Sequence, residues 1–322
     1  MRNLRRLAGP LLTVAVLGFL TWRIGTGPFL AGLGGVDSRA LLAAAGIGLV
    51  TTVCGAWRWT VVARGMGFRL PFPVAVAAYY RALFLNVTLP SGVAGDVHRG
   101  ISHGREIDDV GGGLRAVAWE RGAGQVVQAA LAISALLVLP SPVRSSMPLV
   151  AVAVVGLALA VTLAGRIRLK DEVSRWSRIR SAVISDLRAG VLRPKAVLAI
   201  VLATTVAVLG YALIFLIAAR SAGVTSPVSR LLPLALLATL AMVLPSIAGW
   251  GPREGVATWV FSAAGLGAAR GAAAAVAYGV LVVGAFLPGG LVLLAGWLPE
   301  RRSWRPALRR RIIFQPKGAA DG

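Results

Sequence analysis

Charged side chains, cysteine and histidine are all scarce in this chain of 322 residues. Only 14% of the residues are charged, with 12 Asp and Glu in all, and there are two His and a single Cys. One cysteine cannot form a disulfide within the chain, and no Cys-x-x-Cys or His-Glu-x-x-His spacing offers a metal site. Gly-x-Ser-x-Gly and phosphate-loop patterns are also missing. Because the motifs of metalloenzymes, nucleophilic triads and nucleotide-driven motors are absent, we expect no enzyme activity, no metal and no cofactor.

The chain is instead rich in apolar sequence. Hydrophobic residues make up 57% of it, the mean hydropathy is +0.77, and apolar stretches recur as far as Leu298. Too few polar residues remain to cover a water-facing surface, so we predict an all-α polytopic membrane protein. The net charge of +22 comes from Lys and Arg that cluster between and after the apolar stretches. This pattern is typical of loops that face an anionic leaflet, and it argues against nucleic acid as a partner.

Six stretches are long enough to span a bilayer, at about 20 residues per crossing. They are residues 7–24, 40–63, 112–139, 147–165, 196–219 and 271–298. The first follows three arginines, and a secretory signal is the alternative interpretation there. Two further apolar stretches, 74–89 and 231–244, are shorter. Each ends at the same tripeptide, Leu89-Pro90-Ser91 in the first and Leu244-Pro245-Ser246 in the second. In both cases a second short helical segment follows, and a glycine lies nine residues after the Ser.

We predict that these two shorter stretches form re-entrant helical hairpins. With hairpins, most of the 34 Lys and Arg residues fall on one side, which the positive-inside bias identifies as the cytoplasm. Full crossings would move the basic loop 166–195 to the outside. The hairpins make one transmembrane domain, residues 1–299, from the inverted halves 1–139 and 147–299. A basic tail, 300–322, follows, and both termini are cytoplasmic. The alternative is that Leu-Pro-Ser recurs by chance and that Pro and Gly only kink ordinary helices.

Interrupted helices of this kind mark binding sites in transporters, because the freed backbone groups need partners other than lipid. The helices that restart after Pro90 and at Pro252 would aim their amino-terminal ends inward, where free amides favour an anion such as phosphate. Ionisable side chains at this depth are costly and hence informative. Our candidate ligand-binding residues are Arg81, Asn86, Ser91, Asp96, Arg99, Glu120, Arg121, Ser246, Arg253 and Glu254. Purely structural ion pairs are the alternative for the charged members.

Four other patterns receive structural interpretations. Trp57-Arg58-Trp59 is interpreted as an interfacial anchor at a helix end. Gly111-Gly112-Gly113 and Pro288-Gly289-Gly290 are predicted to permit close helix contact or a kink. Gln125 and Gln128 continue the polar stripe of the preceding Glu-Arg pair along an otherwise apolar helix. We predict that this stripe faces other helices or a cavity.

Three motifs resemble one known family. Residues 84–99, Phe-Leu-Asn-Val-Thr-Leu-Pro-Ser-Gly-Val-Ala-Gly-Asp-Val-His-Arg, resemble the Asn, Pro, Gly-Gly-Asp and Arg pattern of the lysylphosphatidylglycerol synthase transmembrane-region family, also called flippase-like. Trp119-Glu120-Arg121 is similar to the family's Glu-Arg signature, and residues 245–254 are similar to its later Pro, Gly-Gly, Gly and Glu motif. The order and spacing agree across roughly residues 5–300. The chain departs from the family's glycine positions at Ala94, Ala248 and Trp250.

The resemblance implies the translocating part of such a protein without an aminoacyl-transferase domain. We expect a phosphate-bearing lipid, a phospholipid or one linked to polyprenyl phosphate, to move between leaflets of a bacterial cytoplasmic membrane. Its head group would pass through a polar cleft between the hairpins, where Arg99, Arg121 and Arg253 attract the phosphate. The alternatives are an intramembrane head-group transferase or hydrolase that uses carboxylates such as Asp96 or Glu120, and a non-transporting partner subunit of an envelope lipid pathway. Expected partners are membrane lipids and a lipid-modifying enzyme.

Overall fold

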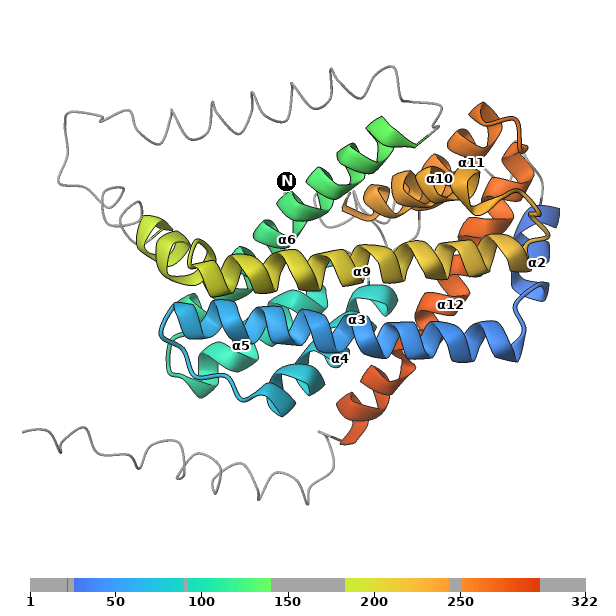
Figure 1. The fold of residues 1–322 in the computed structure, drawn as a ribbon. Coiled ribbons are helices and arrows are strands. Elements are labelled where there is room, and N and C mark those ends of the chain that lie inside the picture. Colours follow the sequence, from blue (N-terminus) through green and yellow to red (C-terminus); the bar gives the residue numbers. More distant parts are fainter. Residues whose placement is uncertain (1–21, 23–25, 90–91, 140–182, 244–250, 296–322) are drawn as a thin grey trace, which may run out of the picture.

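The computed structural model describes residues 22, 26–89, 92–139, 183–243 and 251–295. Within these ranges the chain is helical and has no strand (Figure 1). Four of the helices are long and apolar enough to cross a membrane: α3 (Ser38–Gly65), α6 (Val110–Val138), α9 (Pro194–Ser221) and α12 (Ala268–Ala295). At 1.5 Å per residue each is about 42 Å long, more than the roughly 30 Å of a hydrocarbon core. The chain is therefore a multi-pass helical membrane protein, as predicted.

The four long helices correspond to four of the six predicted spans. They match the stretches 40–63, 112–139, 196–219 and 271–298, with ends that differ by a few residues. The other two predicted spans, 7–24 and 147–165, lie outside the described residues apart from Trp22. The prediction succeeds because the length of an apolar run is a local property that a bilayer selects directly.

Local side chains explain where the long helices begin. The Asp37 carboxylate accepts a hydrogen bond from Ala40 N at 2.8 Å and caps α3. Asp109 caps α6 in the same way, with Gly112 N at 2.7 Å. Each carboxylate satisfies an amide that has no partner within its helix. α9 begins at Pro194, whose missing N–H is harmless in the first turn.

Two pairs of shorter helices occupy the positions of the predicted hairpins. α4 (Phe72–Thr88) packs on α5 (Ala94–Glu106). α10 (Val228–Leu240), extended by the single turn η3 (Ala241–Val243), packs on α11 (Pro252–Ala263). Each of these helices is shorter than the roughly 20 residues that a full crossing needs. The segments between them, 90–91 and 244–250, lie outside the described residues, so the re-entrant geometry and the inverted halves stay predictions.

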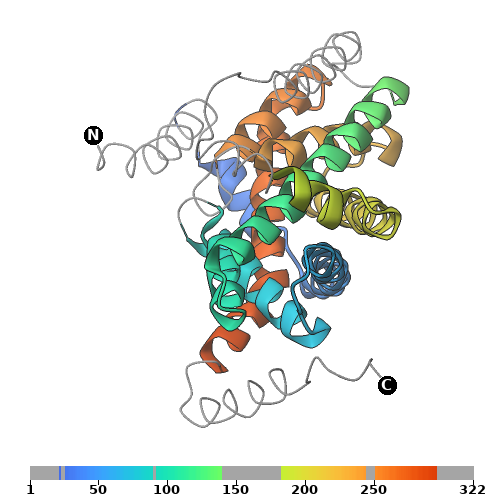
Figure 2. The same cartoon turned by 90° about the vertical axis from the view of Figure 1, so that its left-hand side faces the viewer.

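Helix α12 packs on helices from both ends of the described chain. It contacts α3, α4, α9, α11 and the short helix α2 (Gly27–Gly34). α3 and α9 lie side by side, and Figure 2, which looks nearly along both, shows α12 running across them. A π-helical turn, η2 (Leu187–Val191), precedes α9 and packs on α3 and α6. The largest apolar and aromatic side chains of the shared core are almost fully buried, among them Trp59, Phe215, Phe261, Tyr278 and Phe286.

Glycines set the closest approaches between helices, as the sequence predicts for the glycines of α6 and α12. Gly100 and Gly104 of α5 face Gly113 of α6, where an added Cβ would lie 2.6 Å from Gly104 N. Gly289 of α12 lies directly against the backbone of Tyr80 on α4. Backbones can approach this closely only where no side chain separates them. The contact between α5 and α6 bears directly on the candidate site, because these two helices carry four of the candidate residues, Asp96, Arg99, Glu120 and Arg121.

Candidate functional site

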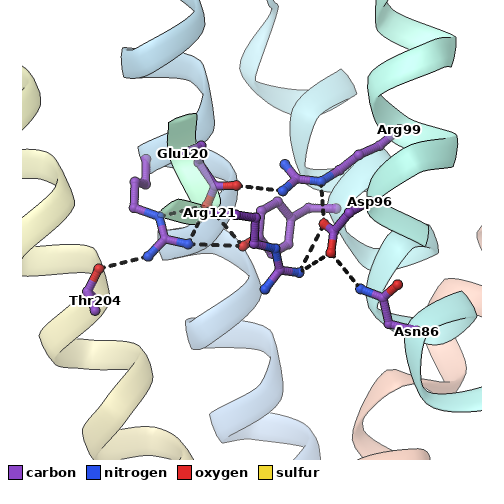
Figure 3. A network of polar contacts seen from close by, with 8 residues as sticks. Asn86, Asp96, Arg99, Glu120, Arg121 and Thr204 are labelled. Atoms are coloured by element: carbon purple, nitrogen blue, oxygen red, sulfur yellow. Dashed lines mark hydrogen bonds and ion pairs between the residues drawn. The ribbon is translucent and has the colours of Figure 1, made fainter. Parts of the chain in front are cut away.

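A buried carboxylate on α6 organises the candidate site. Glu120 has no exposed surface and accepts hydrogen bonds from two arginines on other helices (Figure 3). Arg58 Nε of α3 lies 2.7 Å from Glu120 Oε1, and Arg58 Nη2 also contacts this oxygen. Arg99 Nη2 of α5 lies 2.5 Å from Glu120 Oε2. Each carboxylate oxygen therefore has its own guanidinium group, as a buried anion requires.

A second carboxylate, in the first turn of α5, extends this network. Asp96 Oδ1 accepts a hydrogen bond from Arg99 Nε at 2.8 Å, and Asp96 Oδ2 accepts one from Asn86 Nδ2 at 2.9 Å. Arg121 Nη2 of α6 lies 2.8 Å from Oδ2 and 3.0 Å from Oδ1 (Figure 3). Arg99 thus bridges Asp96 and Glu120. Four of the predicted residues on α5 and α6, together with Asn86 of α4, meet in one place.

Aromatic rings enclose the central arginine. Arg99 Cζ lies 4.6 Å from the ring centre of Trp59 and 4.5 Å from that of Tyr79, so cation–π contacts hold the guanidinium on two sides. Arg121 Cζ is farther from the same tyrosine ring, at 5.9 Å. The Tyr79 hydroxyl donates to Glu120 Oε1 at 3.3 Å. Arg99 is therefore held by carboxylates at its nitrogens and by aromatic rings against its guanidinium group.

The ionisable side chains of this network carry one surplus positive charge. We call them the arginine cluster, which consists of Arg58, Asp96, Arg99, Glu120 and Arg121. Three members are cations and two are anions. The side chains of four members are 0–11% exposed, whereas that of Arg121 is 32% exposed. Arg121 is therefore the most exposed of the five, and an unbalanced charge costs least where its side chain is least enclosed by the protein.

One amide at the start of α5 and one at the start of α11 already have protein partners. Gly95 N donates to Asn86 Oδ1 at 2.8 Å, and Gly251 N donates to Glu254 Oε2 at 2.6 Å. The expectation that these helix ends offer their amides to phosphate is wrong at these two positions, because a side-chain oxygen of the same helix pair takes each amide. Ser91 and Ser246, predicted in the adjoining segments, lie outside the described residues.

The predicted residues of α11 form a second buried group. Arg253 and Glu254 contact each other and are 2% and 0% exposed. Arg253 Cζ lies 4.9 Å from the ring centre of Tyr278 on α12. Tyr211 of α9 interacts electrostatically with Arg121 of the arginine cluster and with Tyr278 of α12. The hairpin tips that would bring both groups into one cleft lie outside the described residues.

Arg58 and its neighbours show what escapes prediction from the sequence. The interpretation of Trp57-Arg58-Trp59 as an interfacial anchor is wrong for Arg58, which is 7% exposed and lies two turns inside α3. Its Nη1 donates to Thr204 Oγ1 of α9 at 2.7 Å (Figure 3). Thr204 and Tyr79 were likewise not among the candidates. One feature of the sequence could have indicated Arg58: a carboxylate in an apolar span, Glu120, needs a cation from another span.

Two further points concern the remaining candidates. Arg81, a predicted ligand residue, is half-buried on α4 and interacts electrostatically with His98 of α5. Gln125, one turn beyond the cluster on α6, is half-buried, and its Oε1 has no hydrogen-bond partner among the described residues. Across the same residues, no group of three or more His, Cys, Asp or Glu side chains is arranged to hold a metal ion.

Comparison with known proteins gives one match. Residues 6–290 match the family model described as Lysylphosphatidylglycerol synthase TM region. The match includes every helix that carries the arginine cluster and also α11. No curated protein and no solved structure matches the chain.

Proposed function

The chain belongs to the lysylphosphatidylglycerol synthase TM-region family, and from that premise we propose that it moves a phosphate-bearing lipid between the two leaflets of the membrane. The family connects the chain with lipid metabolism or transport. The phosphate of the head group passes beside the arginine cluster while the acyl chains stay in the bilayer. Because the sequence has no motif of a nucleotide-driven motor, movement is downhill or coupled to an ion or to the membrane potential.

The surplus positive charge of the arginine cluster is the observation that supports this proposal best. A cluster that served only to hold helices together would balance its charges, because an uncompensated charge inside a membrane protein destabilises it. Within the part of the chain that the structure describes, the carboxylates paired with Arg58, Arg99 and Arg121 are Asp96 and Glu120 alone. A lipid phosphate supplies the missing anion and forms strong charge-assisted hydrogen bonds with guanidinium groups.

The alternative of an intramembrane transferase or hydrolase has less support. Such an enzyme needs a carboxylate that can accept and release a proton. Glu120 is held by two arginines, and Asp96 is held by two arginines and by Asn86. A carboxylate engaged in this way is a poor proton donor.

Reconstitution into vesicles tests the proposal. Vesicles carry a trace of fluorescently labelled phosphatidylglycerol, phosphatidylethanolamine or polyprenyl phosphate, and an impermeant reductant then bleaches the label in the outer leaflet. We expect the protein to expose the inner-leaflet label of at least one probe to bleaching. Mass spectrometry of the extracted lipids should show them chemically unchanged.

The controls separate transport from leakage and from chemistry. Vesicles with a trapped soluble dye report leakage, and protein-free vesicles report spontaneous exchange. If the inner-leaflet label of every probe stays as protected as in protein-free vesicles, the proposal is wrong. A covalent change in an extracted lipid would instead support the transferase or hydrolase.

A further inference from the structure

The arginine cluster divides into a closed set and one additional cation. Without Arg121, the set contains two arginines and two carboxylates and is electrically neutral. Glu120 keeps Arg58 on one oxygen and Arg99 on the other. Asp96 keeps Arg99 Nε on Oδ1 at 2.8 Å and Asn86 Nδ2 on Oδ2 at 2.9 Å. Every carboxylate oxygen therefore retains a donor when Arg121 moves away.

Arg121 is also the member held least tightly. Among the described residues its only ion pair is with Asp96, through one of its terminal nitrogens, Nη2. Its Nε is buried and has no hydrogen-bond partner among the described residues. The Tyr79 ring lies 5.9 Å from Arg121 Cζ but 4.5 Å from Arg99 Cζ, so the stacking that fixes Arg99 is weaker here. With 32% of its side chain exposed, Arg121 is the arginine that a ligand can reach.

Resting on the proposed function, we propose that Arg121 is the ligand-contacting arginine and that a lipid phosphodiester, with its single negative charge, exchanges with Asp96 for it. Asp96 stays with Arg99 and Asn86, so the exchange leaves no carboxylate unpaired. The charge of the cluster together with its ligand falls from one surplus positive charge to zero. A phosphomonoester, which carries about −1.5 to −2 near neutral pH, would instead leave the site negative. The closed set holds the site in shape, and Arg121 selects a monoanion.

Binding to the purified full-length protein in detergent tests this inference. The probes are three lipids with the same acyl chains: phosphatidylglycerol, a phosphodiester; phosphatidic acid, a phosphomonoester; and diacylglycerol, which lacks phosphate. Native mass spectrometry or a fluorescent-lipid titration measures their affinities. We expect phosphatidylglycerol to bind more tightly than phosphatidic acid, and both to bind more tightly than diacylglycerol. Inorganic phosphate is titrated as a competitor to distinguish a lipid ligand from a free anion, and we expect it not to compete.

The variants Arg121→Gln, Arg121→Lys and Arg115→Gln assign the effect to one side chain. We expect Arg121→Gln to weaken phosphatidylglycerol binding about tenfold, as the loss of one charge-assisted contact implies, and to unfold at nearly the wild-type temperature. Arg121→Lys keeps the charge and should restore part of the affinity. Arg115→Gln removes an exposed arginine of the same helix, paired with Asp186, and should bind like the wild type.

Each contrary outcome has a distinct meaning. Wild-type affinity in Arg121→Gln, or tighter binding of phosphatidic acid, contradicts the assignment. If Arg121→Gln fails to fold, the remaining four groups are not a closed set, and the inference is wrong. Competition by inorganic phosphate overturns the lipid as ligand. If the wild type moves lipid in vesicles and Arg121→Gln moves it equally fast, the inference fails while the proposed function stands. If phosphatidylglycerol binds through Arg121 but no lipid moves in vesicles, the inference stands and the proposed function fails.

Discussion

Glu120 shows how a single buried anion constrains the residues around it. Two guanidinium groups and the hydroxyl of Tyr79 surround its carboxylate, which has no exposed surface. Replacing a whole buried ion pair with apolar groups is often harmless, whereas removing one partner leaves the others charged and unsatisfied. Removal of the Glu120 charge is therefore expected to cost more stability than the loss of one of its hydrogen bonds, because both arginines lose their partner at once.

Glu120→Gln should destabilise the folded protein by about 3–5 kcal/mol, because Arg58 and Arg99 then face a neutral amide in a buried site. Unfolding by titration with a denaturing detergent measures the change. The matched control is Asp186→Asn, which breaks a half-exposed ion pair with Arg115 and should cost about 1 kcal/mol or less. Equal unfolding curves for the two variants would show that Glu120 contributes no more to stability than the Arg115–Asp186 ion pair does.

The contact between α5 and α6 sets the geometry of the cluster. α5 carries Asp96 and Arg99, and α6 carries Glu120 and Arg121. Gly113 of α6 lies so close to the α5 backbone that the two helices meet without an intervening side chain. The separation of these helices therefore fixes the distances between the charges that they carry.

Gly113→Ala should push α5 and α6 apart, since the new Cβ would lie 2.6 Å from Gly104 N. We expect a loss of about 1–3 kcal/mol in unfolding free energy, typical of overpacking, together with weaker binding of phosphatidylglycerol. Gly122→Ala on the same helix is the control, because nothing lies within 4 Å of its added Cβ. That change should be neutral or stabilise by up to about 1 kcal/mol through helix propensity. If Gly113→Ala and Gly122→Ala have the same unfolding free energy and the same affinity for phosphatidylglycerol, the close approach of α5 and α6 at Gly113 does not set the geometry of the cluster.

At the scale of the whole molecule, the part of the chain that the structure describes combines four helices long and apolar enough to span a bilayer with two pairs of helices that are too short to span. α4 with α5, and α10 with α11, each form a packed pair. Short helices inside a bilayer are tolerated where other helices cover their ends. The predicted topology places the base of the first pair on the cytoplasmic side and the base of the second pair on the outer side.

Labelling of single cysteines from each face of intact cells tests this topology. The variants Ser102→Cys on α5 and Ser229→Cys on α10 are made in a Cys54→Ala background, because Cys54 is the only native cysteine. An impermeant maleimide should label position 229 in intact cells and position 102 only after the cells are opened, because the two hairpins enter from opposite sides. Labelling of position 102 from outside, or of position 229 only in opened cells, would rule out the inverted arrangement.

Much of the fold could be predicted because its signals are local. Apolar run length located α3 and α9, and the glycines pointed to close helix contacts. The partners inside the site could not be predicted in the same way. Arg58 is 62 residues from Glu120 and 146 residues from Thr204, and only the packing of three helices brings these side chains together. An arginine flanked by tryptophans fits a membrane interface equally well until its burial and its contacts with Glu120 and Thr204 are seen.

The amino-acid sequence by itself determined the membrane class, the positions of the four long helices and, apart from Arg58, the identity of the charges in the cluster. These properties depend on residue type and run length, and hydropathy and the cost of burying a charge follow from them directly. Only the tertiary structure decided which charges neutralise one another. The surplus at Arg121 emerges only when neighbours from different helices are counted together, because electrostatic balance depends on distances in space and not on separation along the chain.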